Sequence, residues 1–239
     1  MLIKSGADMK KFLTYIASSL TIVLFTGTYA FSGEGLNPIS KPDPITVNVG
    51  YMSEYWIRGS FQAASVTHAS INYTSDPIYI SAGWADLRDR KGTTSYNEGE
   101  AFISLYGTYN FKLSSIPTYI GLAAYRYTDG IDQHYNELTV GADFSLFSID
   151  AVIIGDYDTS PSSDYWHFQV TVPLSSFNYT YGTYSGAWQY VFHEISYMTT
   201  VNEIDLGLKL GMNNDNAMGA SANSNQDTTY AVITIGYAF

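Results

Sequence analysis

The chain has 239 residues, of which 46% are hydrophobic, 16% aromatic and only 14% charged, and it contains no cysteine. Disulfides and thiolate metal sites are therefore excluded, and so many aromatic side chains argue against a disordered chain. With 11 basic and 22 acidic residues the formal net charge is −11, which argues against a nucleic-acid partner because phosphate backbones bind to basic surfaces.

Residues 1–30 have the pattern of a cleaved secretory signal peptide. Lys10 and Lys11 precede the apolar stretch FLTYIASSLTIVLFTG, and small residues follow around Ala30. A membrane anchor is the alternative, but the apolar run is short and no basic flank follows it. Met9 is a second candidate for the start of translation. Residues 31–44 carry three of the seven prolines and are expected to form a flexible periplasmic lead-in.

From Ile45 to Phe239 the alternation of polar and apolar residues predicts a single all-β domain. Most of the predicted strands run for about ten residues, which is the length that a tilted strand needs to cross a bilayer. Twelve strands are expected, and ten is the alternative if 177–184 or 191–199 is partly loop. The expected spans are 45–58, 65–74, 77–86, 99–111, 117–128, 135–144, 146–157, 164–173, 177–184, 191–199, 203–212 and 228–239.

The connections between these strands alternate in length. Long ones are expected at 57–64, 86–99, 128–134, 158–164, 182–190 and 213–227, and short ones at 75–77, 112–117, 145, 174–176 and 200–202. This alternation is typical of an up-and-down antiparallel transmembrane β-barrel, with long extracellular loops on one rim and tight periplasmic turns on the other.

Most strands carry an apolar face and a face with charges in mid-strand. At 203–212, for example, Leu206 and Leu208 alternate with Asp205 and Lys209, whereas at 117–128 Arg126 shares the parity of apolar residues. We expect the apolar faces to contact outer-membrane lipid and the polar faces to line a lumen. The candidate pore-lining residues are Glu54, Arg58, His68, Glu100, Glu137, Asp143, Asp150, Asp156, His167, Glu203, Asp205 and Lys209.

The last strand, 228–239, is apolar on one parity and ends in Tyr237-Ala238-Phe239. This ending resembles the C-terminal signal of bacterial outer-membrane proteins. We therefore expect the outer-membrane assembly machinery to read Tyr237 and Phe239, and we expect the protein to reside in the bacterial outer membrane.

The first strand contains Ser53, Glu54, Tyr55, Arg58 and Gly59, and this run resembles the Ser-(Asp/Glu)-Tyr-x-x-Arg-Gly opening of the TorF family of porins. The segments HASINYTSDPIYISAGWAD and HYNELTVGADFSLFSIDAVIIGDYDTSP are similar to two further hairpins of that family. The similarity covers residues 45 to about 173 and is looser beyond. The sequence departs from the family at Ala63-Ala64, where Gly or Pro is frequent. The resemblance implies a barrel and a channel, but no substrate.

Carboxylates outnumber bases in the candidate set, so we expect passive diffusion of small solutes or ions with a mild preference for cations. A closed plug of ion pairs is the alternative, and it would make the protein a non-conducting structural or adhesive barrel. An outer-membrane hydrolase is the third class.

An enzyme is not expected. His134 with Asp132 and Ser160 with Ser162 and Ser163 lie in predicted loops, but neither a Gly-x-Ser-x-Gly nor an HExxH run is present. No cofactor or metal is expected either, because the loop 213–227 lacks the spacing of a calcium site.

Overall fold

The computed structural model describes residues 44–87, 101–128, 134–157, 164–186, 189–214 and 228–239. The predicted signal peptide, almost all of the lead-in and most of the predicted long loops lie outside these residues, so they stay predictions. No helix in the described part of the chain is long and apolar enough to cross a membrane.

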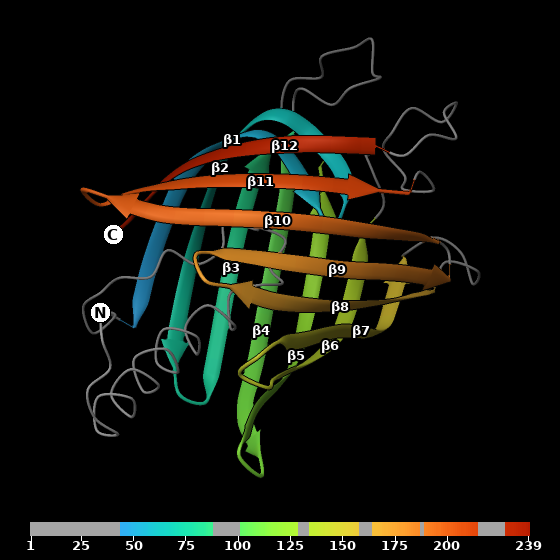
Figure 1. Ribbon diagram of the computed structural model, residues 1–239. Coiled ribbons are helices and arrows are strands. Elements are labelled where there is room, and N and C mark those ends of the chain that lie inside the picture. Colours follow the sequence, from blue (N-terminus) through green and yellow to red (C-terminus); the bar gives the residue numbers. More distant parts are fainter. Residues whose placement is uncertain (1–43, 88–100, 129–133, 158–163, 187–188, 215–227) are drawn as a thin grey trace, which may run out of the picture.

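The described residues form twelve strands that close into one antiparallel barrel, in which each strand pairs with the next and β1 pairs with β12 (Figure 1). The predicted fold class and strand count are thus confirmed, and the ten-strand alternative is wrong. The strands are β1 (Ile45–Ile57), β2 (Ser60–Ser75), β3 (Ile78–Asp86), β4 (Ala101–Leu113), β5 (Ile116–Tyr127), β6 (Tyr135–Asp143), β7 (Ser148–Tyr157), β8 (Tyr165–Leu174), β9 (Phe177–Gly186), β10 (Tyr190–Val201), β11 (Ile204–Asn213) and β12 (Thr228–Ala238).

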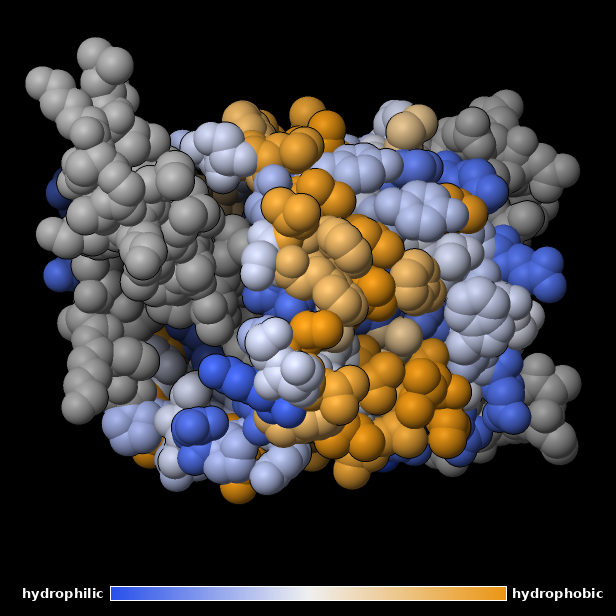
Figure 2. Space-filling model, turned by 60° about the horizontal axis from the view of Figure 1, so that its bottom comes forward, coloured by the Kyte–Doolittle hydropathy of each residue, from blue (hydrophilic) through white to orange (hydrophobic). Residues whose placement is uncertain are grey.

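The two faces of the wall differ in polarity. On β11, Leu206, Leu208 and Leu210 are exposed on the outside, whereas Asp205 is buried on the inside. Figure 2 shows hydrophobic side chains gathered in a broad band across one side of the barrel, with hydrophilic ones toward its ends. Closure of the barrel gives most backbone groups of the wall strands partners within the sheet, which is the condition for strands that cross lipid.

The connections that follow the even-numbered strands β2, β4, β6, β8 and β10 are short, as predicted. Together they form what we call the short-turn rim. They span 76–77, 114–115, 144–147, 175–176 and 202–203, and most begin with a positive φ, as at Ser114, Ser175 and Asn202. Tight turns with positive φ suit the right-handed twist of paired strands. The opposite end, where β3 and β11 end and β4 and β12 begin, is the long-connection rim.

Two predicted long connections are wrong. The first, 57–64, is a two-residue turn at Arg58 and Gly59, where both residues have positive φ, and β2 begins at Ser60. The fifth, 182–190, shortens to 187–189, because Tyr184 and Tyr190 pair across β9 and β10 and their rings stack with centroids 4.8 Å apart. In both places side chains buried inside the barrel extend the strands beyond what alternation predicts.

The rims give a prediction about orientation. An epitope inserted after Asn223, in the last long connection, is expected to be labelled by antibody on intact cells, because barrels of this kind carry their long loops outside. The same epitope inserted after Ser175, in a short turn, is the control and should be labelled only after permeabilisation. The reverse pattern would refute the orientation.

The C-terminus takes part in barrel closure, which bears on the predicted assembly signal. The Phe239 N–H donates to the Val47 carbonyl at 3.0 Å, and the Val47 N–H donates to the Phe239 carbonyl at 2.8 Å. The rings of Tyr237 and Phe239 are exposed on the outside. The predicted recognition of the ring and the observed closure of the seam therefore depend on different parts of Phe239.

Both Phe239→Ala and deletion of Phe239 are expected to reduce the amount of heat-modifiable, folded barrel in the outer membrane. The alanine variant keeps the two backbone hydrogen bonds and loses only the ring, so its defect would measure recognition by the assembly machinery. A defect confined to the deletion would instead assign the whole effect to closure of the seam.

Candidate functional site in the lumen

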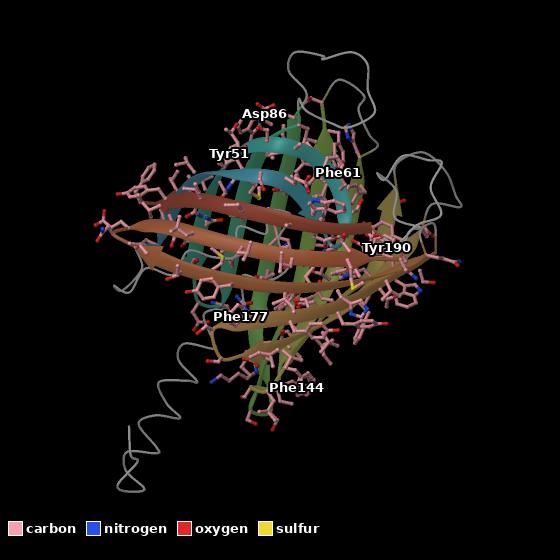
Figure 3. All side chains as sticks on the ribbon, turned by 45° about the horizontal axis from the view of Figure 1, so that its top comes forward. Tyr51, Phe61, Asp86, Phe144, Phe177 and Tyr190 are labelled. Atoms are coloured by element: carbon pink, nitrogen blue, oxygen red, sulfur yellow. The ribbon has the colours of Figure 1, made fainter. Side chains whose placement is uncertain are left out.

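The outer part of the first hairpin leaves the barrel wall and enters the lumen. β1 pairs with β12 only from Asn48 to Met52, and β2 pairs with β3 only from His68 onward. Residues 53–67, which we call the hairpin tip, pair only within the first hairpin and bend away from the wall (Figure 1). Figure 3 shows Phe61 of the tip and Tyr190 of β10 toward the same end of the barrel, away from Phe144 and Phe177 of the short-turn rim.

Local irregularities accompany this bend. Ser65 has a φ of 58°, and the β1–β2 register shifts between Tyr55 and Trp56. A shift of this kind is a β-bulge, which bends and twists the strand that carries it. Ser65 and Thr67, at the base of the tip, are exposed. Closer to the turn both faces are covered, and the neighbouring residues Tyr55 and Trp56 are both buried.

An ion pair fixes the turn of the tip to the far wall. The two terminal nitrogens of Arg58 reach the two carboxylate oxygens of Glu137, on β6, at 2.7 and 3.0 Å. The Glu137 side chain has no exposed surface and that of Arg58 is 9% exposed. Glu137 also accepts a hydrogen bond from Tyr165 at 2.7 Å, and Arg58 donates to Tyr184 at 3.2 Å. Such a bidentate pair orients both partners, and breaking it would strand a buried charge.

Three further strands donate hydrogen bonds to the turn backbone and to the residue Gln62 beside it. The Tyr190 hydroxyl donates to the Arg58 carbonyl at 2.9 Å, and the Asn213 amide donates to the Gly59 carbonyl. The Tyr127 hydroxyl donates to the Gln62 side chain at 3.0 Å. The tip therefore makes polar contacts with β5, β10 and β11 as well as with β6 and β9.

Aromatic rings fill the space around the tip. Tyr55 meets Phe102 of β4 edge to face, with centroids 6.0 Å apart, and Trp56 stacks on Tyr230 of β12 at 3.9 Å. Tyr55 and Phe102 have no exposed surface and Phe192 is 1% exposed. The half of the lumen nearer the long-connection rim is thus packed like a protein core.

The half nearer the short-turn rim is lined differently, mostly by hydroxyl and amide groups. The side-chain oxygens of Thr108, Asn110 and Thr139 are buried and find no hydrogen-bond partner among the described residues. Buried polar groups are normally satisfied by protein or by ordered water, so we expect this half to hold water. The polar side chains that line it include Asn48, Ser70, Asn72, Ser81, Thr108, Thr139, Gln169 and Ser196.

A second ion pair crosses neighbouring strands. Lys209 on β11 lies 3.4 Å from a carboxylate oxygen of Glu194 on β10, and Glu194 also accepts a hydrogen bond from Tyr230 at 2.6 Å. Glu194 was not among the predicted pore-lining residues. Glu194 could have been predicted from the alternation along β10, because it shares its parity with Phe192 and Ser196, which are also buried inside the barrel.

Most of the predicted pore-lining residues have inward or half-buried side chains, and Arg58 and Glu137 are brought into contact. Glu54 accepts a hydrogen bond from Trp56 at 2.8 Å, and Asp150 accepts one from Tyr119 at 2.5 Å. The inward or half-buried members are Glu54, Arg58, His68, Glu137, Asp150, His167, Asp205 and Lys209.

Four predicted residues differ from this group. Asp143 is also half-buried, but it ends β6 and accepts the Ser145 N–H at 2.6 Å, as a turn cap. Asp156 is exposed, because a bulge between Val152 and Gly155 changes the parity of β7. Glu203 is exposed in a short turn, and Glu100 lies outside the described residues. A bulge of this kind cannot be detected from the alternation of polar and apolar residues in the sequence.

The histidines give no support to hydrolase chemistry. The His134 ring nitrogen accepts the Tyr127 N–H, and His193 contacts the Tyr179 hydroxyl at 2.7 Å. Within the described ranges no three His, Asp or Glu side chains are placed to hold a metal ion. Ser160, Ser162 and Ser163 lie outside those ranges.

Comparison with known proteins places the fold. No family model and no curated protein matches the chain by sequence. Among solved structures, the KdgM porin matches over 81% of this chain and 99% of its own, with a TM-score of 0.52 at 8% identity. The fold is that of an outer-membrane porin-like β-barrel. The same porin in complex with disordered oligogalacturonate matches this porin-like barrel with a TM-score of 0.51, again at 8% identity and over 81% and 99% of the two chains.

A barrel enzyme is also similar in shape. The outer membrane phospholipase A from Escherichia coli matches over 80% of the porin-like barrel and 92% of its own chain, with a TM-score of 0.47 at 11% identity. That score is too low to carry an argument about activity.

Proposed function

We propose that the protein is an outer-membrane channel for the passive diffusion of small solutes or ions, of the kind that the TorF resemblance implies. The observation that carries the proposal is the polar interior of a closed barrel whose outside is apolar. Charged groups such as Asp150 and Asp205 are buried on the lumen side, and buried charges are costly in a barrel that water does not enter. The likeness to the KdgM porin supports the fold on which the proposal rests.

The charges inside the barrel favour cations. The Arg58 and Lys209 side chains each lie against a carboxylate, Glu137 and Glu194, and Asp150 adds a further carboxylate to the buried set. An excess of carboxylates in a narrow lumen attracts cations because low-dielectric walls focus the field. The oligogalacturonate seen with the KdgM porin is a polyanion, and we expect this lumen to exclude such solutes.

A non-conducting structural or adhesive barrel is the second candidate, and the packed hairpin tip favours it. With Tyr55 and Phe102 fully buried, the half of the lumen nearer the long-connection rim offers no wide passage while the tip occupies it. The two candidates therefore differ in one property, which is whether ions cross the barrel.

Conductance in planar bilayers separates the two candidates. The parent protein is compared with a variant in which Asn-Gly replaces residues 55–63 and joins Glu54 to Ala64, which are opposite each other in β1 and β2 and so suit a two-residue turn. We expect larger conductance steps from the variant, and a reversal potential that favours K⁺ over Cl⁻ in a KCl gradient. A folded, heat-modifiable variant that does not conduct would refute the channel and support the structural barrel.

A further inference from the structure

Among the residues that the structure describes, part of β12 has no strand partner on the side of β1. Residues 234–238 of β12 pair with β1, whereas residues 228–233 pair with β11 alone. At the point where pairing stops, the Ile233 N–H is met by the Ser53 side chain at 2.9 Å instead of by a backbone carbonyl. Exposed backbone groups are costly in the hydrocarbon region, so this edge of the wall is a favourable place for a strand to add.

The first hairpin itself contains a segment that could pair with this edge, because the register between β1 and β12 can continue past Met52. Observed pairs run from Asn48 with Ala238 to Met52 with Thr234. The next six steps place residues 53–58 opposite residues 228–233. These are the residues of β1 that now enter the lumen, together with Arg58 of the turn.

The polarity of β1 suits that wall position. In the continued register Tyr55 and Ile57 would follow Val49 and Tyr51 on the lipid face, while Glu54 and Arg58 would point inward. This is the lipid-out, polar-in alternation of a transmembrane strand. In the structure Tyr55 instead lies in the lumen, fully buried. The outer part of β1 therefore has a polarity pattern that suits the wall, although it is observed in the lumen.

One contact belongs to both positions. Trp56 would lie opposite Tyr230 in the continued register, and the two rings are already stacked at 3.9 Å in the lumen position. In the lumen position the tip has its ion pair to Glu137 and its hydrogen bonds from Tyr190 and Asn213. In the wall position it would exchange these for a backbone ladder with β12.

We propose that the hairpin tip is a movable plug with two positions, one in the lumen and one in the wall beside residues 228–233 of β12. Solutes pass when the tip is in the wall. The proposal rests on the channel function and assigns its regulation to the first hairpin.

Engineered cysteines test the movement, and the natural chain contributes no cysteine of its own. The double variant Tyr55→Cys and Ala231→Cys places thiols that are opposite each other only in the wall position, where side chains across an antiparallel pair come close enough for a disulfide. Under mild oxidation of the full-length protein in liposomes, we expect the disulfide to accumulate with time. Ile57→Cys with Thr229→Cys is a second pair, in case removal of the Tyr55 ring impairs folding.

A matched control measures how readily a disulfide forms between two paired wall strands that are not expected to move. Ile195 and Leu210 are opposite each other in β10 and β11 and both are exposed on the outside, so Ile195→Cys with Leu210→Cys should form its disulfide without affecting conductance. The oxidised tip variant should conduct several-fold more than the same sample after reduction with dithiothreitol.

The outcomes separate the two proposals. Cross-linking of the control pair but of neither tip pair would overturn the movable plug. A tip disulfide that leaves conductance unchanged would overturn the claim that the wall position opens the passage, provided that the Asn-Gly variant conducts. Absence of conductance from the Asn-Gly variant would count against the channel function itself.

Discussion

Replacement of Glu137 by Gln is expected to lower the free energy of unfolding of the barrel by about 3–5 kcal/mol, which is the usual loss when one partner of a buried ion pair is removed. The variant leaves the Arg58 guanidinium buried without a counter-charge, and it weakens the acceptor of the Tyr165 hydroxyl. Because the ion pair holds the tip in the lumen, conductance should rise at the same time. Urea unfolding followed by tryptophan fluorescence and planar-bilayer recording measure the two effects.

Asp143→Asn is the matched control on the same strand. Asp143 lies at the end of β6 and accepts the Ser145 N–H, and the Asn oxygen can take over that role, so we expect a change below about 1 kcal/mol. The double variant Arg58→Gln with Glu137→Gln removes both charges of the pair, so neither is left without its partner, and it should recover part of the stability. If Glu137→Gln were as stable as Asp143→Asn, the ion pair would not be what fixes the tip.

Gly59→Val is the second substitution that we expect to change stability and conductance strongly. Its cause is steric, whereas that of Glu137→Gln is electrostatic. Gly59 has a φ of 77°, and a Cβ added there would lie 2.5 Å from the Cβ of Phe192. A β-branched residue in this backbone region costs about 1–3 kcal/mol of strain, and the collision with Phe192 adds to it. The turn must then move, and the hydrogen bonds that Tyr190 and Asn213 donate to it are lost. We expect lower stability together with higher conductance.

Gly107→Val controls for the substitution itself. A Cβ at Gly107 would have its nearest neighbour, the Tyr79 carbonyl oxygen, at 3.8 Å, and valine is favourable in a strand. Its stability and conductance should match those of the parent. A Gly59→Val protein that also matches the parent would show that the turn does not need the close approach to Phe192.

Most strands could be predicted from the sequence to within a few residues, because side-chain alternation is a local property that any strand between lipid and a polar interior must show. The span 203–212 was predicted and Ile204–Asn213 is observed, and 117–128 corresponds to Ile116–Tyr127. The same alternation predicted which face of most strands is apolar, and the short turns followed from the breaks between strands.

The path of the first hairpin could not be predicted from the sequence. Alternation places Tyr55 on the lipid face and makes residues 57–64 a loop, yet Tyr55 is fully buried in the lumen and β2 begins at Ser60. The partners that hold the tip, such as Glu137 for Arg58, lie 79 positions away along the chain. The alternation of β1 suits both the wall and the lumen. Which of the two it occupies depends on such distant contacts and on the space inside the closed barrel, and local alternation of residues contains neither.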